Sequence, residues 1–252
     1  MRILIISDIH SNNDALGTIV SNELDCEVVC CVGDFVDYGI APNEVIATVQ
    51  SLGQEKYFVY GNHDVLLLDF ILSMEKLPEN PKEFKWLHDN VRTIDQASVR
   101  FLENLPEVSW FSCDGWIYMV KHQYDDAYGY VRGVEDFDAF WQKYMPEQYW
   151  QAPKRRMVFG HTHRQEYRIF YGNRECINPG SISYRRPDEH DKQAHYCVIQ
   201  NSEVQLRRVP YNRDSLFQAA QKYKNQQAMM DTEIQDFNFF FGNAATTRES
   251  LD

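Results

Sequence analysis

Polar segments that carry metal-ligand side chains follow five short apolar runs in this chain. The five segments are Ser7 to His10, Gly33 and Asp34, Gly61 to Asp64, Lys121 and His122, and Gly160 to His163. The runs that precede them are Ile3 to Ile6, Val28 to Val32, Tyr57 to Tyr60, Trp116 to Val120 and Met157 to Phe159. Short β-branched or aromatic runs bounded by polar residues or glycine are typical of buried strands. Because the carboxyl ends of strands in an open α/β sheet form a ligand crevice, we expect the five segments to converge there.

The rest of the pattern predicts an α/β fold with two packed sheets. Residues 13–24 and 42–52 are predicted helices that follow the first two strands. From residue 164 onward, strands separated by tight turns predict antiparallel β structure, followed by a helix from 214 to about 230. We therefore expect a largely parallel N-terminal sheet and a more antiparallel C-terminal sheet, with helices on their outer faces.

Length, charge and cysteine content limit the classes of function. The 252 residues suffice for one domain, which we place at 1–242 with a polar tail over 243–252. A net charge of −12 disfavours long nucleic acid as a partner. Only four apolar residues precede Ser7, too few for a signal sequence or a membrane span. The six cysteines lack C-x-x-C pairing and are predicted to be small buried hydrophobes. We expect a cytoplasmic protein with no membrane partner, and the sequence leaves its oligomeric state open.

The five segments combine carboxylate, amide and imidazole donors. The candidate metal ligands are Asp8, His10, Asp34, Asn62, His122, His161 and His163. This mixture suits manganese, iron or zinc better than calcium or magnesium, which favour oxygen-only shells. Two such ions about 3.5 to 4 Å apart hold the attacking and leaving oxygens of an in-line phosphoryl displacement. With Asp8 and Asp34 as the only anionic ligands, the pair would keep positive charge for a phosphate oxygen.

The motifs together resemble those of the calcineurin-like metallophosphoesterases, specifically their small single-domain bacterial and archaeal branch. D-x-H begins at Asp8, G-D-x-x-D at Gly33, G-N-H-D at Gly61 and G-H-x-H at Gly160, all within residues 1–186. The resemblance implies a four-layer α/β/β/α sandwich of two mixed sheets with a dinuclear metal site.

The resemblance also implies a role for each candidate ligand. One metal ion would be held by Asp8, His10 and His163. The other would be held by Asn62, His122 and His161, and Asp34 would bridge the two. No glycine follows His122, which departs from the usual pattern of the family.

Two further segments resemble family motifs whose residues lie beside the metal ions. His63 stands where a histidine protonates or stabilises the leaving oxygen, and Asp64 is expected to orient it. The segment Asn178-Pro179-Gly180-Ser181 resembles a turn that closes the site in this branch.

Two comparisons with the family narrow the chemistry. Asp37-Tyr38-Gly39 replaces the Asp-Arg-Gly of protein phosphatases and so lacks their phosphate-gripping arginine. Some members that favour diesters have a cysteine in place of His63, so monoester or anhydride cleavage stays open here.

Several side chains near the motifs are candidates for roles that the sequence does not settle. Asp37 is either a partner of a metal-bound histidine or a turn residue that caps the following helix. Arg185 and Arg186 are candidates to bind a substrate phosphate, with a solvated loop as the alternative. Tyr124 is a candidate substrate contact, and with Tyr128 and Tyr130 could stack a nucleobase.

We therefore expect a metal-dependent phosphoric ester or anhydride hydrolase. A metal-bridging hydroxide would attack phosphorus in line while His63 assists the departing oxygen. The cofactor would be two divalent or trivalent transition metal ions, manganese or iron, with zinc as an alternative. Substrates would be small and nucleotide-like, and dinucleoside polyphosphates such as diadenosine tetraphosphate are candidates. A generic phosphodiesterase and a non-catalytic metal-binding scaffold are the alternatives.

Overall fold

The protein is described by a computed structural model covering residues 1–125, 128–183, 192–242 and 246–248. The strands are β1 Arg2–Ile6, β2 Val28–Val32, β3 Glu55–Val59, β4 Val108–Cys113, β5 Trp116–Lys121, β6 Arg155–Val158, β7 Gln165–Phe170, β8 Arg174–Pro179, β9 Ala194–Gln200 and β10 Glu203–Val209. The helices are α1 Asn13–Asn22, α2 Pro42–Ser51, α3 Asn62–Leu72, α4 Trp86–Thr93, α5 Gln96–Glu103, α6 Val134–Tyr144, α7 Asp214–Gln226 and α8 Asp231–Phe241. Short 3-10 turns lie at Pro81–Glu83 and Glu147–Tyr149.

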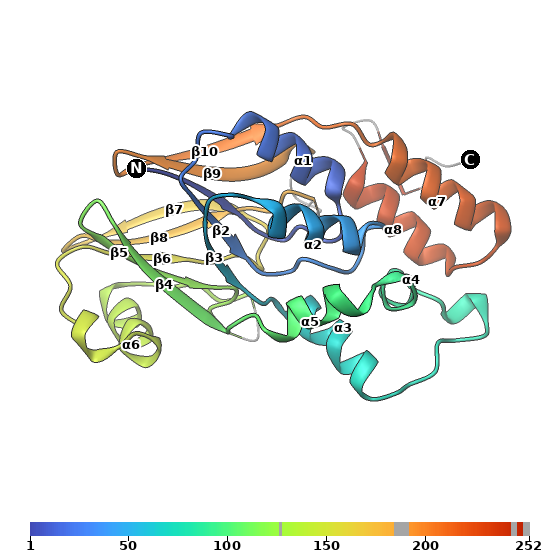
Figure 1. Ribbon diagram of the computed structural model, residues 1–252, viewed down its shortest axis with the longest axis horizontal. Coiled ribbons are helices and arrows are strands. Elements are labelled where there is room, and N and C mark those ends of the chain that lie inside the picture. The colour runs from blue at the N-terminus through green and yellow to red at the C-terminus, as the bar shows by residue number, and fades with distance from the viewer. Residues whose placement is uncertain (126–127, 184–191, 243–245, 249–252) are drawn as a thin grey trace.

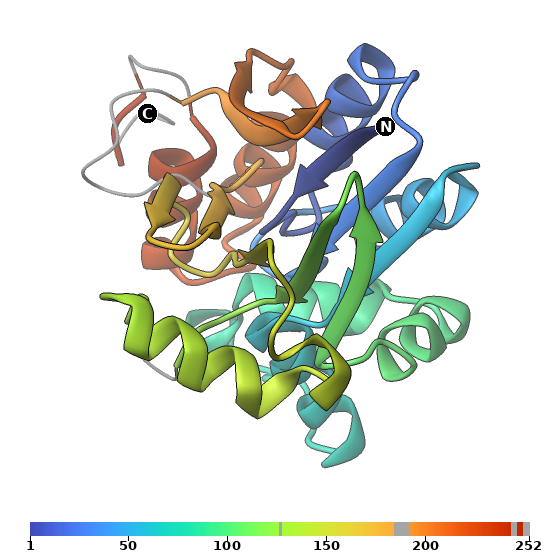
Figure 2. The ribbon, with the colours of Figure 1, turned by 90° about the vertical axis from the view of Figure 1, so that its left-hand side faces the viewer.

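Two five-stranded mixed sheets form the centre of the molecule. The first has the order β10-β9-β1-β2-β3, and the second has the order β4-β5-β6-β8-β7. In the first sheet β1, β2 and β3 are parallel, whereas β9 pairs antiparallel with both β1 and β10. In the second sheet β5, β6 and β8 are parallel, whereas β4 and β7 form antiparallel edges. Figure 2 shows the two sheets edge-on, with α1 and α2 on one side and α6 on the other.

Alternate side chains of β1 enter two different hydrophobic cores. Leu4 and Ile6 pack in the core that the first sheet shares with α1, α2, α5, α7 and α8. Ile3 and Ile5 pack in the core between the two sheets. A strand covered on both faces needs apolar residues at every position, which explains the continuous apolar runs in the sequence.

The outer face of the second sheet is covered by α6. Phe137 and Trp141 of this helix pack with Met119 and Met157 of β5 and β6 in a third core. Three cores between two sheets and two helical layers make the four-layer α/β/β/α sandwich, and the predicted fold class is confirmed.

The division of strands between the sheets differs from the sequence-based expectation. β9 and β10 from the C-terminal half join the N-terminal sheet, and β8 lies parallel to β6. Each sheet is therefore mixed, because strand order depends on long-range pairing that local alternation does not encode. The sequence pattern also missed α4, and it did not identify residues 231–241 as a helix, in which Phe237 and Phe241 are buried.

The loops that follow the parallel strands of the first sheet lie at one end of the sandwich, next to several helices. In Figure 1 the carboxyl ends of β1, β2 and β3 point toward α3, α4 and α8. None of the helices in the described ranges has the length and apolar character needed to cross a membrane.

Candidate metal centre

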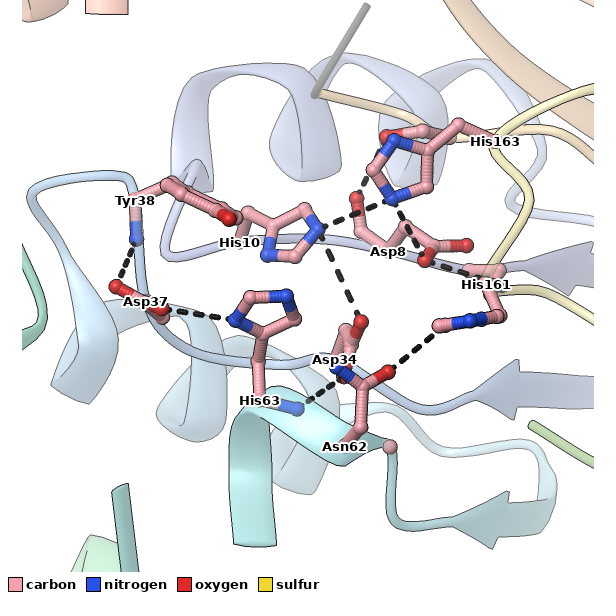
Figure 3. A network of polar contacts seen from close by, with 12 residues as sticks. Asp8, His10, Asp34, Asp37, Tyr38, Asn62, His63, His161 and His163 are labelled. Carbon is pink, nitrogen blue, oxygen red and sulfur yellow. Dashed lines mark hydrogen bonds and ion pairs between the residues drawn. The ribbon is translucent and has the colours of Figure 1, made fainter. Parts of the chain in front are cut away.

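The residues that follow β1, β2, β3, β5 and β6 meet at one edge of the sandwich. Asp8 and His10 follow β1, Asp34 follows β2, and Asn62 begins α3 after β3. Figure 3 shows these side chains directed toward one another and toward His161 and His163, which follow β6. The predicted convergence of the strand ends is confirmed for these segments.

The backbone at this edge adopts an uncommon conformation. Fourteen non-glycine residues in the described ranges have φ in the left-handed region, and eight of them are in these loops. They are Asp8, His10, Ser11, Asp34, Asp37, Tyr38, His161 and His163. Left-handed φ costs free energy for a residue with a Cβ, so such residues concentrate where the surrounding structure holds them for function.

The first donor group contains two carboxylates and two imidazoles. One ligand atom each from Asp8, His10, Asp34 and His163 lies within 4.8 Å of the others. His163 Nε2 is 3.1 Å from Asp8 Oδ1 and 3.4 Å from His10 Nε2. His10 Nε2 lies 3.9 Å from Asp34 Oδ2 (Figure 3). These donors can surround one transition metal ion.

The second donor group lies on the other side of Asp34. Asn62 Oδ1 is 3.1 Å from His122 Nε2 and 2.9 Å from His161 Nδ1. His122 Nε2 is 3.2 Å from Asp34 Oδ2. Burial alone would lower the pKa of His122, but the Asp34 carboxylate raises it to about 9. A cation bound here would therefore displace a proton.

The charge state of the cluster fits a pair of cations. Asp8 Oδ2 is buried without a hydrogen-bond partner among the described residues, and the buried Asp34 Oδ2 makes no regular hydrogen bond there although the His122 ring lies 3.2 Å away. Burial opposes ionisation of Asp34, but His122 and His63 outweigh it and hold its pKa well below the usual value. Burial lowers the pKa of His10 to about 3, so its imidazole is neutral and can bind a metal. Buried anionic oxygens without donors are costly unless a cation compensates them.

His63 lies beside the donor groups but pairs with a different side chain. Its Nδ1 is 2.8 Å from Asp37 Oδ2, and its backbone N–H donates to Asp34 Oδ1 at 2.9 Å. Burial alone would lower the pKa of His63, but the charges of Asp34 and Asp37 raise it to about 9. At neutral pH the ring therefore carries a proton that it can donate.

The expectation that Asp64 orients His63 is wrong. Both Asp64 carboxylate oxygens accept hydrogen bonds from backbone N–H groups, at Asp34, Phe35, Val36 and Gly61. Asp64 therefore fixes the loop after β2 against the start of α3. The orienting carboxylate is Asp37, which does not cap α2, since the N-cap there is Ala41.

Tyr38 forms a wall beside the catalytic candidate. Its ring centroid lies 5.0 Å from that of His10 and 4.8 Å from that of His63. From the sequence, Tyr38 is identified only as the residue that replaces the arginine of protein phosphatases. The structure places an aromatic ring beside both imidazoles (Figure 3).

Glycines and the turn after β8 hold the loops close together. A Cβ on Gly61 would lie 2.1 Å from Asp34 Oδ1, so only glycine fits there. The Asn178 side-chain amide donates to the Gly160 carbonyl at 2.7 Å, and the Ser181 hydroxyl donates to the Asp8 carbonyl at 2.9 Å. These hydrogen bonds hold the loops after β1 and β6 against the end of β8.

Asn90 of α4 is a positioning residue that sequence reasoning missed. Its side-chain oxygen accepts from the Ser11 hydroxyl and, at 3.1 Å, from the Asp37 backbone N–H. Its amide donates to the carbonyls of Gly39 at 2.8 Å and Trp86 at 3.1 Å. Asn90 therefore connects the loops after β1 and β2. No sequence motif surrounds it, because its role arises only when α4 packs against these loops.

We expect Asn90→Ala to destabilise the fold and slow catalysis. Because the substitution leaves buried donors and acceptors without partners, the free energy of unfolding in urea should fall by about 3 kcal/mol. Since Asn90 holds the Asp37 backbone, kcat should fall by about tenfold. Asn104→Ala, at an exposed asparagine, is the control. Equal stability of the two variants would contradict the assigned role.

The candidate substrate contacts differ in their surroundings. Tyr124 is half-buried and packs against Phe140 at a centroid distance of 4.8 Å. Tyr128 is exposed and stacks on His161, with ring centroids 4.9 Å apart. Tyr130 lies under the Arg168 guanidinium. Arg185 and Arg186 lie outside the described residues.

Comparisons with known proteins found a matching family model, a related sequence and similar structures. The family model described as a calcineurin-like phosphoesterase superfamily domain matches residues 1–203. An uncharacterised protein from Methanocaldococcus jannaschii is 24% identical over 233 residues, which cover 83% of this chain and 88% of that protein. A metallophosphoesterase structure from Sphaerobacter thermophilus has a TM-score of 0.67 and 22% identity over 94% of this chain and 98% of that chain. A hypothetical protein from Pyrococcus horikoshii has a TM-score of 0.70 and 14% identity over 97% of this chain and 99% of that chain. The two structures share the fold.

Proposed function

The chain belongs to the calcineurin-like phosphoesterase superfamily, and we propose that it is a metal-dependent hydrolase of small phosphoric esters or anhydrides with a dinuclear centre. One observation carries the dinuclear proposal. Asp34 Oδ2 lies 3.9 Å from His10 Nε2 in the first donor group and 3.2 Å from His122 Nε2 in the second. A carboxylate in this position can serve two cations at once.

The proposed ligands divide between the two cations. The first would be held by Asp8, His10 and His163, the second by Asn62, His122 and His161, and Asp34 would be shared. Manganese or iron, with zinc as the alternative, matches the mixture of imidazole, carboxylate and amide donors. When bound, two such ions supply a nucleophile at neutral pH and neutralise charge on the phosphoryl oxygens.

The side chains around the donor groups would carry out the remaining steps. His63, whose Nδ1 lies 2.8 Å from Asp37 Oδ2 and whose pKa is raised to about 9, would give a proton to the departing oxygen. Asp8 and Asp34 are the only carboxylates of the proposed ligand set, so a cation pair there keeps net positive charge that attracts the phosphate group of a substrate.

For the physiological substrate we propose a small nucleotide-like compound, with dinucleoside polyphosphates such as diadenosine tetraphosphate among the candidates. Exposed aromatic surface at Tyr128 next to His161 supports a planar base near the bound phosphate. Tyr124, Arg185 and Arg186 remain proposed substrate contacts. The charge of −12 supports the absence of a long nucleic-acid partner, and six free cysteines support a reducing, cytoplasmic setting.

A substrate panel tests this function. Protein stripped of metal and then loaded with manganese is assayed on nucleotides, dinucleoside polyphosphates, monoesters and diesters. We expect hydrolysis only after loading, and faster turnover of nucleotide-like substrates. Activity restricted to diesters would favour a generic phosphodiesterase. Metal binding without hydrolysis of any substrate would favour a scaffold.

Tyr128 offers a specific test of the nucleotide preference. Stacking of a base on an aromatic ring is worth roughly 1 to 3 kcal/mol, so Tyr128→Ala should raise KM for a nucleotide substrate by about tenfold. Hydrolysis of a small aryl phosphate should change much less. Tyr171→Ala, at an exposed tyrosine after β7, serves as the control. The same change in KM for both substrates would remove the stacking role.

A further inference from the structure

A cavity of about 430 Å³ opens beside the second donor group. Asn62 and His122 form part of its wall, together with Glu107, residues around the start of α3, the end of β5 and the end of α6. Pockets that hold small molecules usually measure roughly 300 to 1,000 Å³. This cavity is therefore large enough for a substantial part of a substrate whose phosphorus lies at the donor groups.

Two lysines stand in the wall of this cavity. Lys121 is buried, and its Nζ lies 2.9 Å from Glu107 Oε1 and 4.9 Å from the ring centroid of Tyr144. Lys143, near the end of α6, places its Nζ 4.8 Å from the same ring. Two ammonium groups beside one ring concentrate positive charge in a chain whose net charge is −12.

The acidic residues of the wall leave room for an anion to bind. The Glu107 side chain is 49% exposed, whereas that of Lys121 is only 9% exposed. An incoming phosphate can therefore take the place of the Glu107 carboxylate as the partner of the Lys121 ammonium group. The Glu107 side chain can then rotate into solvent. Asp125, the second acid in the wall among the described residues, is exposed and accepts a hydrogen bond from the Gly129 backbone N–H.

The surroundings favour an anionic group over a nucleobase in this cavity. The ring of Tyr144 already contacts two ammonium groups, and Tyr124 packs against Phe140. The neighbouring cavity, which Tyr124 also lines, has a volume of only about 40 Å³. A second phosphoryl group can pair with the two ammonium groups in the wall of the larger cavity, and the space that remains can take the group attached to it.

We propose that this cavity binds a second phosphoryl group of the substrate through Lys121 and Lys143. The inference rests on the proposed function and narrows its substrate class to compounds that carry at least two phosphoryl groups, such as phosphoanhydrides. The phosphoryl group that is cleaved lies at the donor groups, and its neighbour extends toward α6. Charge-assisted hydrogen bonds to phosphate supply the affinity.

Binding of two stable phosphonates tests this subsite without hydrolysis. Manganese-loaded protein is titrated calorimetrically with methylenediphosphonate, which carries two phosphoryl-like groups, and with methylphosphonate, which carries one. Lys143→Met should weaken the binding affinity for methylenediphosphonate by about tenfold. Its effect on the affinity for methylphosphonate should be at least about fivefold smaller. Lys143→Arg should restore most of the affinity. Lys154→Met, at an exposed lysine beside Trp116, should leave both affinities as in the original protein.

A substitution that should increase the affinity for methylenediphosphonate distinguishes the proposed subsite from structural damage. Because Glu107 competes for Lys121, Glu107→Gln should strengthen methylenediphosphonate binding by about threefold. Equal effects of the lysine substitution on both phosphonates, or no preference for methylenediphosphonate in the original protein, would overturn the subsite. If the preference and its loss in Lys143→Met are observed but no phosphoester is hydrolysed, the subsite stands and the proposed function fails. If monoesters are hydrolysed without the preference, the proposed function stands and the subsite fails.

Discussion

Asp34→Asn is expected to empty both metal positions and to reduce phosphoesterase activity by more than about 100-fold. One carboxylate oxygen of Asp34 faces both donor groups, so the loss of its charge weakens both cations together. Changes around a metal ligand commonly cost 10- to 100-fold in affinity or activity, and loss of a shared ligand should exceed that range. Metal content of the purified protein, measured by mass spectrometry, and kcat/KM for an aryl phosphate are the two readouts.

The matched control is Asp69→Asn, which removes the same charge from an exposed position on α3. It should keep both metals and full activity. A circular dichroism spectrum equal to that of the original protein would show that Asp34→Asn has not unfolded the chain. Retention of two tightly bound metals by the folded Asp34→Asn protein would refute the shared role.

His63→Ala is expected to keep both metals but to lose about 10²- to 10⁴-fold in kcat, the usual contribution of a positioned acid. The ring contacts Asp37 and is absent from both donor groups, so its loss leaves the proposed ligands in place. An activated leaving group departs without a proton. The loss should therefore be smaller for p-nitrophenyl esters than for alkyl esters.

Asp37→Asn tests the same role through the partner of His63. It should show the same ordering of leaving groups with a smaller loss, since the imidazole remains but is less well oriented. Equal losses of His63→Ala on both classes of ester would remove the general-acid role. Loss of metal from His63→Ala would make His63 a ligand instead.

The sequence predicted the features that depend on local pattern. Val28 to Val32 form a strand that is apolar at every position because both of its faces are covered. The ligands that follow Ile6 and Val32 converge because both strands are parallel and end at the same edge. Period and polarity were enough to locate these elements and the ligand segments between them.

The features that the sequence did not predict depend on contacts between distant segments. β9 pairs with β1 across more than 190 residues, and no local signal defines that neighbour. Asp37 rather than Asp64 meets His63, because left-handed φ at Asp37 and Tyr38 redirects the loop after β2. Asn90 acquires its role only when α4 packs against that loop.

Anomalous diffraction from crystals soaked in manganese tests the dinuclear centre most directly. We predict two peaks about 3.5 to 4 Å apart, as in other paired metal sites. One peak should lie among Asp8, His10 and His163, the other among Asn62, His122 and His161, with the Asp34 carboxylate between them. A single peak, or peaks outside these two donor groups, would contradict the account.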